Sequence, residues 1–314
     1  MGVLTVAGTM ALAVAVVALI ARYVPGMTLP VVATAALAPY LMLGAPLAMI
    51  PLAVSGSWIA VAVAGAVTVA TVAVQLPWYT RGRAEPGAVV RVVSANLRYG
   101  RADPQAIVRI ASDHADILAV QERTPEKAEL ISAAGMDTVL PYHELRAREG
   151  PAGVGIWSRF PMHRGAEYDE FWVGLFTAQV RIPDVAGPVT VIAAHMSAPW
   201  PDVFQGWHDD LARLDTTLHD IASSADGPVM LAADLNATPD NLEFRRLLHN
   251  GYRDAAEQAG AGLTRTHPSD VRLLPPVFAV DHILTRSCAA ISVCTLNIPG
   301  SDHRALASVI TVPT

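Results

Sequence analysis

Before Glu85 the chain has no acidic residue and only three basic ones, and three apolar stretches fill this region, at 3–21, 30–53 and 58–77. Each stretch is close to the ~20 residues that a helix needs to cross a bilayer. A cleaved signal peptide would explain only the first stretch, and three tandem buried core helices are uncommon. The sequence therefore predicts three transmembrane helices, the middle one kinked by its prolines.

The three early arginines bear on orientation. With three spans, Arg22 shares one side of the membrane with Arg81 and Arg83. The positive-inside rule places that side, and everything after it, in the cytoplasm. The two cysteines, Cys288 and Cys294, would lie ~20 Å apart on one extended strand, too far to form a disulfide, and so say little about the compartment.

From Glu85 onward, 19 basic residues face 28 acidic ones, a net charge of −9. Such an acidic region gains little from the release of counterions from a phosphate backbone. Long nucleic acids are therefore unlikely partners for this part of the chain.

A buried strand is predicted at 229–233, opened by Gly-Pro and followed at once by Asp234 and Asn236. Residues two apart on a strand point the same way, and ligands of α/β sheets bind at such strand ends. These two side chains are therefore candidates for a site. The alternative is that they only form an Asx turn and cap the next helix.

Other predicted strands also end in polar side chains, and a helix is predicted to start at Asp103-Pro104. Any one strand-end residue is more often structural than catalytic, but the set contains the carboxylate, amide and imidazole groups that bind Mg²⁺ and phosphate. The residues are Asn96, Glu122, His195, Asp234, Asn236, Asp281, Asp302 and His303. Ser158 and Arg159 end a further strand-like run at 153–161, whose other residues indicate a hairpin strand.

In its order of motifs the chain resembles the endonuclease/exonuclease/phosphatase superfamily. The motifs are Asn96, Gln121-Glu122, 153–161, His195, Asp234-Leu-Asn-Ala-Thr-Pro, Asp281-His282 and Ser301-Asp-His303, with Ala233 where a glycine is more usual. The resemblance implies an α/β fold, a four-layer αββα sandwich of two mostly antiparallel sheets flanked by helices. The expected organisation is a membrane anchor at 1–80, a linker at 81–87 and a catalytic domain at 88–314.

The resemblance also implies roles for individual residues. Glu122 would hold a divalent metal, Mg²⁺ or Mn²⁺, with Asn96 and Asp302 as further ligands or as neighbours that support a ligand. Asn236 and His195 would donate hydrogen bonds to the phosphate.

Three further residues would carry the proton chemistry. Asp234 would orient or deprotonate the attacking water, and Asp281 would fix the tautomer of His303. His303 would act either as a base or as a cationic clamp on the phosphate, and the sequence does not decide between them.

The predicted function is hydrolysis of a phosphate ester or pyrophosphate, on a lipid-linked substrate among membrane lipids. The alternatives are a membrane-tethered nuclease and a catalytically silent binding or sensing module. The multi-span N-terminus is similar to a membrane-anchored branch, the VanJ-type glycopeptide-resistance proteins. That branch implies a multi-pass protein of the cell membrane with an extracytoplasmic catalytic domain, contrary to the arginine count. The exact substrate, the metal used in vivo and the oligomeric state are left open.

Overall fold

Two six-stranded sheets form the centre of the molecule in a computed structural model that describes residues 2–146, 152–201 and 204–314. The first sheet has the order β11–β12–β1–β2–β4–β3, with β1 (Ala88–Asn96), β2 (Ile117–Gln121), β3 (Tyr142–Arg146), β4 (Val154–Ser158), β11 (Ala289–Asn297) and β12 (Arg304–Val312). The second has the order β5–β6–β7–β8–β10–β9, with β5 (Met162–Tyr168), β6 (Gly174–Val180), β7 (Val189–His195), β8 (Val229–Asp234), β9 (Arg253–Asp254) and β10 (Asp281–Arg286).

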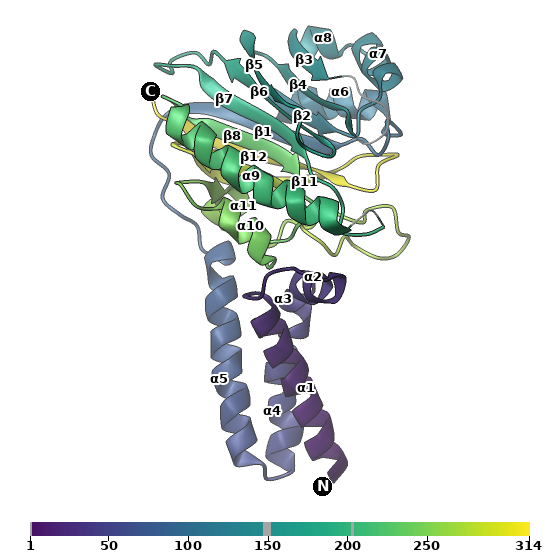
Figure 1. Ribbon diagram of the computed structural model, residues 1–314, viewed down its shortest axis with the longest axis vertical. Coiled ribbons are helices and arrows are strands. Elements are labelled where there is room, and N and C mark those ends of the chain that lie inside the picture. The colour runs from purple at the N-terminus through teal and green to yellow at the C-terminus, as the bar shows by residue number, and fades with distance from the viewer. Residues whose placement is uncertain (1, 147–151, 202–203) are drawn as a thin grey trace.

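Only the pairs β1–β2 and β7–β8 are parallel, and the other neighbouring strands are antiparallel. The sheets pack face to face through buried apolar side chains such as Val92, Ile156, Phe176 and Met230. Helices cover both outer faces (Figure 1). The predicted two-sheet α/β sandwich is therefore confirmed.

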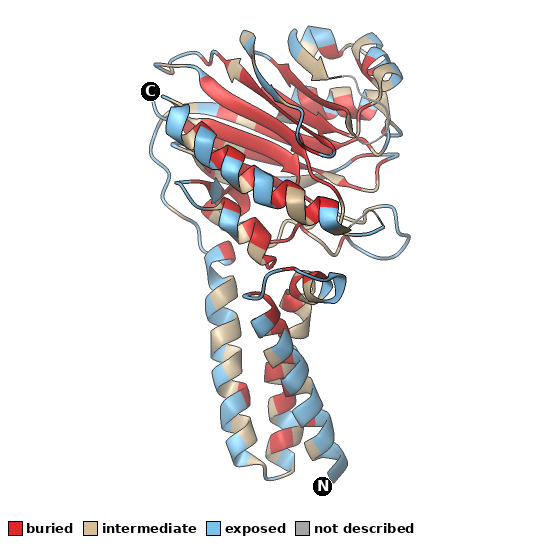
Figure 2. Cartoon of the chain, in the orientation of Figure 1, coloured by how far each residue is buried: buried red, intermediate tan, exposed pale blue. Residues whose placement is uncertain are grey.

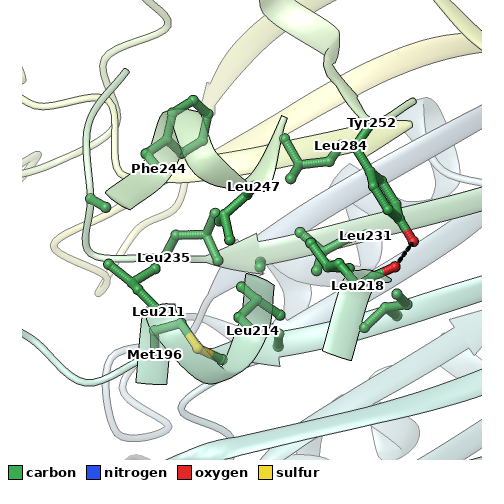
Figure 3. Packing of buried hydrophobic residues seen from close by; sticks show 14 of the residues in the cluster. Met196, Leu211, Leu214, Leu218, Leu231, Leu235, Phe244, Leu247, Tyr252 and Leu284 are labelled. Atoms are coloured by element: carbon green, nitrogen blue, oxygen red, sulfur yellow. Dashed lines mark hydrogen bonds between the residues drawn. The ribbon is translucent and has the colours of Figure 1, made fainter. Parts of the chain in front are cut away.

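The outer faces are closed by helices whose apolar positions recur at helical spacing. On the first sheet lie α6 (Pro104–His114), α7 (Pro125–Ala133) and α8 (Met136–Val139), and on the second lie α9 (Phe204–Ser224) and α10 (Leu242–Leu247), with α11 (Ala255–Ala259) beside β11. Asp103 caps α6 by accepting a hydrogen bond from the Gln105 amide, as predicted. Leu211, Leu214 and Leu218 of α9 pack against β8 and α10 (Figure 3).

The apolar N-terminal third forms helices that project from one end of the sandwich (Figure 1). Two of the predicted spans are helices long and apolar enough to cross a membrane: α1 (Gly2–Ala21), and α5 (Trp58–Gln75) continued by the 3₁₀ helix η1 (Leu76–Tyr79). Their outward faces are largely exposed (Figure 2), as expected for helices that contact lipid.

The middle stretch is bent, as predicted, but it is broken into separate helices rather than continuous. It is divided into α2 (Leu29–Ala36), α3 (Ala38–Leu41) and α4 (Gly44–Val54), with a bend of 61° after α2. Proline lacks an amide hydrogen and clashes with the preceding turn, and Pro39 and Pro46 lie at or near the starts of α3 and α4. Three passes through a bilayer therefore require that this bent pair act as one broken span.

The helical third is tied to the sandwich by specific contacts. Val32 of α2 and Trp78 of η1 are buried in the same apolar cluster as α9 and α10. Arg22, just after α1, forms a buried ion pair with Asp240, and Gln75 donates a hydrogen bond of 2.9 Å to the same carboxylate. The loop after β8 is thus held by two helices of the N-terminal third.

Candidate active site

The register of the strands brings the predicted polar residues to one edge of both sheets. Asn96 pairs with Gln121 at the end of the parallel strands β1 and β2, and His195 pairs with Asp234 at the end of β7 and β8. Asp281 also lies opposite Asp234, because β10 starts where the antiparallel β8 ends. Residues far apart in sequence therefore meet at one place.

Asn96 connects the two sheets at this edge. Its side-chain amide donates hydrogen bonds to Glu122 Oε1 at 3.0 Å and to Asp234 Oδ2 at 2.9 Å, while its Oδ1 accepts the Arg98 backbone amide at 2.8 Å. One amide thus holds two carboxylates that would otherwise repel each other. Glu122 has a φ of 52°, a left-handed conformation that costs about 1 kcal/mol or more in a residue with a side chain. Strain of this kind is typical of functional sites.

Glu122, His195 and Asp234 form a group that fits a divalent cation, because one ligand atom from each lies within 4.8 Å of the others. The His195 Nε2 atom is 3.8 Å from Glu122 Oε1 and 3.7 Å from Asp234 Oδ2. Two carboxylates and one imidazole, with no thiolate, suit a hard or borderline metal ion.

His303 forms a second group with Asp281 and Asp234. Its Nδ1 atom is 2.8 Å from Asp281 Oδ2, and its Nε2 atom is 3.7 Å from Asp234 Oδ2. Burial lowers the pKa of His303, but the two aspartates outweigh burial and raise this pKa to about 10. The ring is therefore an imidazolium at neutral pH.

The pKa of Asp234 is held below its usual value. Burial acts to raise this pKa, but the charges of His303 and His195 and a hydrogen bond from Asn96 together lower it by more than burial raises it. The Asx turn that was weighed as the alternative is present, since Asp234 Oδ1 accepts the Asn236 amide at 3.0 Å. The other carboxylate oxygen remains for the site, and Asn241 rather than Asp234 occupies the N-cap of α10. The turn and the site therefore use different oxygens of one residue.

The conformation of Asn236, two residues after Asp234, is fixed by its neighbours. Asn236 has a φ of 48°, its side-chain amide donates to Met196 O at 2.9 Å, and its carbonyl accepts the Trp207 indole at 2.9 Å. Asp302 lies beside the two groups rather than in them, since its carboxylate faces the Arg98 guanidinium at 3.4 Å. A metal-binding role for Asp302 stays a prediction.

Ser158 and Arg159 lie at the opposite edge of the first sheet. Because β4 is antiparallel to β2, Ser158 is paired with Ile117 at the start of β2, and Arg159 binds Asp116 there at 2.9 Å. The sequence thus predicted the strand β4 correctly, but it did not show that β4 runs antiparallel to β2 and therefore ends at the edge away from the site.

His267 and Ser301 belong to the site but were not predicted as site residues. The His267 ring contacts the His303 ring in a tilted arrangement, with centroids 4.5 Å apart. Burial, and to a smaller extent the charge of His303, lowers the pKa of His267. Ser301 donates to Asn96 O at 2.8 Å and accepts the His303 amide at 3.0 Å. Ser301 stood within a recognised motif, whereas His267 lies in an irregular segment without any periodic signal.

Comparison with known proteins agrees with this geometry. Residues 93–303 match the Endonuclease/Exonuclease/phosphatase family, which is more than half of the chain. The chain belongs to this family. Its members generally hydrolyse phosphoester bonds and depend on a divalent metal, and the Glu122 group is where such a metal would fit. Among curated proteins, none matches the chain.

Solved structures support the same fold. D. rerio TDP2 in complex with a single-strand DNA product is 16% identical, with a TM-score of 0.58 over 72% of this chain and 100% of that one. Truncated Caenorhabditis elegans TDP2 is 16% identical, with a TM-score of 0.58 over 72% of this chain and 99% of that one. An endonuclease/exonuclease/phosphatase from Beutenbergia cavernae DSM 12333 is 18% identical, with a TM-score of 0.53 over 72% of each chain. At these identities the likeness shows the fold alone.

Proposed function

We propose that the protein is a membrane-anchored phosphoesterase that uses Mg²⁺ or Mn²⁺ to hydrolyse a lipid-linked phosphate ester or pyrophosphate. The supporting observation is the position of the site relative to the apolar helices. The loop after β8, which carries Asn236, is the loop whose Asp240 binds Arg22 and Gln75 of the helical third. A substrate held in the same membrane would be concentrated at such a site.

Each side chain would act on the phosphoryl group in a defined way. Glu122, with His195 and Asp234, would hold the cation, which when bound neutralises charge on the phosphoryl oxygens. The lowered pKa of Asp234 keeps this carboxylate ionised, so that it would orient the attacking water. His303, kept cationic by Asp281, would bind a phosphoryl oxygen or donate a proton to the leaving oxygen. The raised pKa of His303 favours the clamp or acid over the base.

An outward-facing catalytic domain is part of this proposal. The positive-inside rule counts charged residues beside the spans, but Arg22 is buried in its ion pair with Asp240. Only Arg81 and Arg83 then remain to oppose an outward domain.

Protease added to intact cells should digest the catalytic domain, and its survival until lysis would place the domain in the cytoplasm. A link to glycopeptide resistance belongs to the same proposal, through a lipid carrier of cell-wall synthesis.

The test uses full-length protein in lipid nanodiscs with a long-chain prenyl pyrophosphate as substrate and a single-stranded oligonucleotide as competitor. We expect phosphate release that stops in chelator and returns with Mg²⁺ or Mn²⁺. Glu122→Ala should abolish release, whereas Glu126→Ala, four residues along on an exposed position of α7, should keep it. Faster cleavage of the oligonucleotide would favour the nuclease, and no turnover of either would favour the silent module.

A further inference from the structure

A cavity of about 480 Å³ lies between α2 and the loops of the catalytic domain. Its volume is within the ~300–1,000 Å³ range of sites that bind small organic ligands. It borders the active site, since Asn236 and His267 are among its lining residues. Figure 1 shows α2 lying across the base of the sandwich, where it can form such a wall. The cavity thus joins the helical third to the site.

The walls of this cavity are mostly apolar. On one side α2 contributes Leu29, Val32, Ala33 and Ala36. On the other side are Trp200, Phe278 and Val280, together with two prolines. Apolar walls stabilise an apolar ligand roughly in proportion to the surface that both remove from water.

Two polar residues in the wall are already satisfied by other protein groups. The Thr238 hydroxyl donates to Asn241 Oδ1 at 2.9 Å, and the Asn241 amide donates to Val32 O at 3.2 Å. Neither residue therefore needs a hydrogen bond from a ligand. The edge of a nucleobase would lose its bonds to water there without replacement, so this wall suits a hydrocarbon better than a base.

The cavity reaches from the site to the surface. At the site, the Nδ1 atom of His267 is buried without a hydrogen-bond partner among the described residues, while its ring contacts His303. Toward the surface, the side chains of Leu29 and Trp200 are 38% and 71% exposed. Exposed tryptophan beside an apolar helix is typical of the membrane interface. A ligand here can have a polar head at His303 and a tail that leaves past α2.

We propose that this cavity binds the segment of a prenyl or acyl chain that adjoins the substrate phosphate, with the rest of the chain continuing into the bilayer. The proposal rests on the proposed function and makes it specific. The broken middle span acquires a role, because α2 forms the wall that a continuous membrane helix would not supply. The enzyme then selects its substrate by the apolar chain as well as by the phosphate.

The first test narrows the cavity without touching the catalytic residues. Ala33→Trp places a large side chain in the α2 wall, and Ala73→Trp makes the same change at an exposed position of α5, away from the cavity. Methyl pyrophosphate and the pyrophosphate of a twenty-carbon prenyl chain share the same head, and only the second has a chain that can fill the cavity. We expect the full-length enzyme to favour the prenyl substrate in kcat/KM by about 10–100-fold.

Ala33→Trp should remove most of that preference while leaving turnover of methyl pyrophosphate, which has no chain to place in the cavity, within about twofold. Ala73→Trp should keep the preference. Equal loss for both substrates, or an unchanged preference in Ala33→Trp, would overturn the proposal, and so would a larger loss of oligonucleotide cleavage than of lipid cleavage. If the wild-type protein hydrolyses neither pyrophosphate, the proposed function fails. The cavity is then tested by the measurement of ligand binding alone.

Binding is measured on the wild-type chain, so it does not depend on a variant that folds. A prenyl phosphonate with a photoreactive diazirine near its head is crosslinked to full-length protein in nanodiscs, and the labelled peptides are identified by mass spectrometry. We expect label at 29–37 and 278–280, suppressed by excess unlabelled prenyl phosphate. Label confined to α1 and α5 would show simple partition into lipid and would refute the site.

Discussion

Two buried histidine–aspartate pairs occur next to each other along β10, and only one faces the site. Asp281 binds His303 Nδ1 at 2.8 Å, and the following residue, His282, binds Asp254 at 2.8 Å through its own Nδ1. Successive residues of a strand point to opposite faces, so His282 lies against Phe244 with ring centroids 4.1 Å apart, outside the site. The two pairs have the same partner groups but different surroundings, since His303 Nε2 faces Asp234 and His282 Nε2 contacts the backbone carbonyl of Ala237 at 3.0 Å.

This duplication allows a matched experiment. Asp281→Asn should lower kcat/KM by about 10²–10³, because His303 loses the carboxylate that orients it and keeps it cationic. Asp254→Asn breaks an equivalent buried pair and should lower the melting temperature while leaving kcat/KM within about threefold of wild type. Comparable losses of activity in both variants would mean that Asp281 is structural.

At the scale of the elements, the edge of the first sheet opposite the site is held by ion pairs. Asp116, before β2, accepts hydrogen bonds from Arg91 of β1 at 2.8 Å and from Arg159 after β4 at 2.9 Å. Burial acts to raise the pKa of Asp116, but these hydrogen bonds outweigh burial and lower it. Three strands are thus joined by one carboxylate, far from the catalytic residues.

The contribution of Asp116 to stability depends on pH. Its folded-state pKa lies below the unfolded value of ~3.9, so its stabilisation is complete above that value and is lost as the pH falls through the folded pKa. Asp116→Asn should lower the melting temperature at pH 7 by about 2–4 °C, since the partly exposed arginines limit the effect to ~1 kcal/mol. The difference from wild type should close as the pH falls below the unfolded value and through the lowered folded-state pKa. Asp113→Asn, an exposed neighbour, serves as the control.

For the whole molecule, the ion pair between Arg22 and Asp240 joins the helical third to the catalytic loop. Both side chains are almost fully buried, and a buried charge that loses its partner costs about 3–5 kcal/mol. Arg22→Met should therefore lower the melting temperature in detergent by about 10 °C. It should also lower turnover of a small soluble phosphate ester, because the loop that carries Asn236 is released.

Replacing both partners tests whether the charge itself causes the loss. Arg22→Met combined with Asp240→Leu should recover much of the melting temperature, since well-packed apolar residues can replace a buried ion pair at little cost. A double variant less stable than Arg22→Met alone would show that Asp240 has another essential role at this position, through Gln75.

The sequence by itself determined the features that depend on local physics. An alternating stretch marked β1, and apolar stretches ended by polar residues marked β2, β7 and β8. Asp103-Pro104 marked the start of α6, because cap chemistry acts over a few residues. The length of the apolar stretches marked α1 and α5 in the same way. The candidate residues Asn96, Glu122, His195, Asp234 and His303 came from the same strand-end pattern.

Only the tertiary structure decided how these pieces meet. A buried strand reads the same in one sheet or in two, so face-to-face packing followed from the family resemblance and not from periodicity. The direction of β4, which sends Arg159 away from the site, depends on its pairing with β2. The contact of the His267 ring with His303 depends on two residues more than thirty positions apart. Such contacts leave no periodic signal, because they arise only when distant segments pack together.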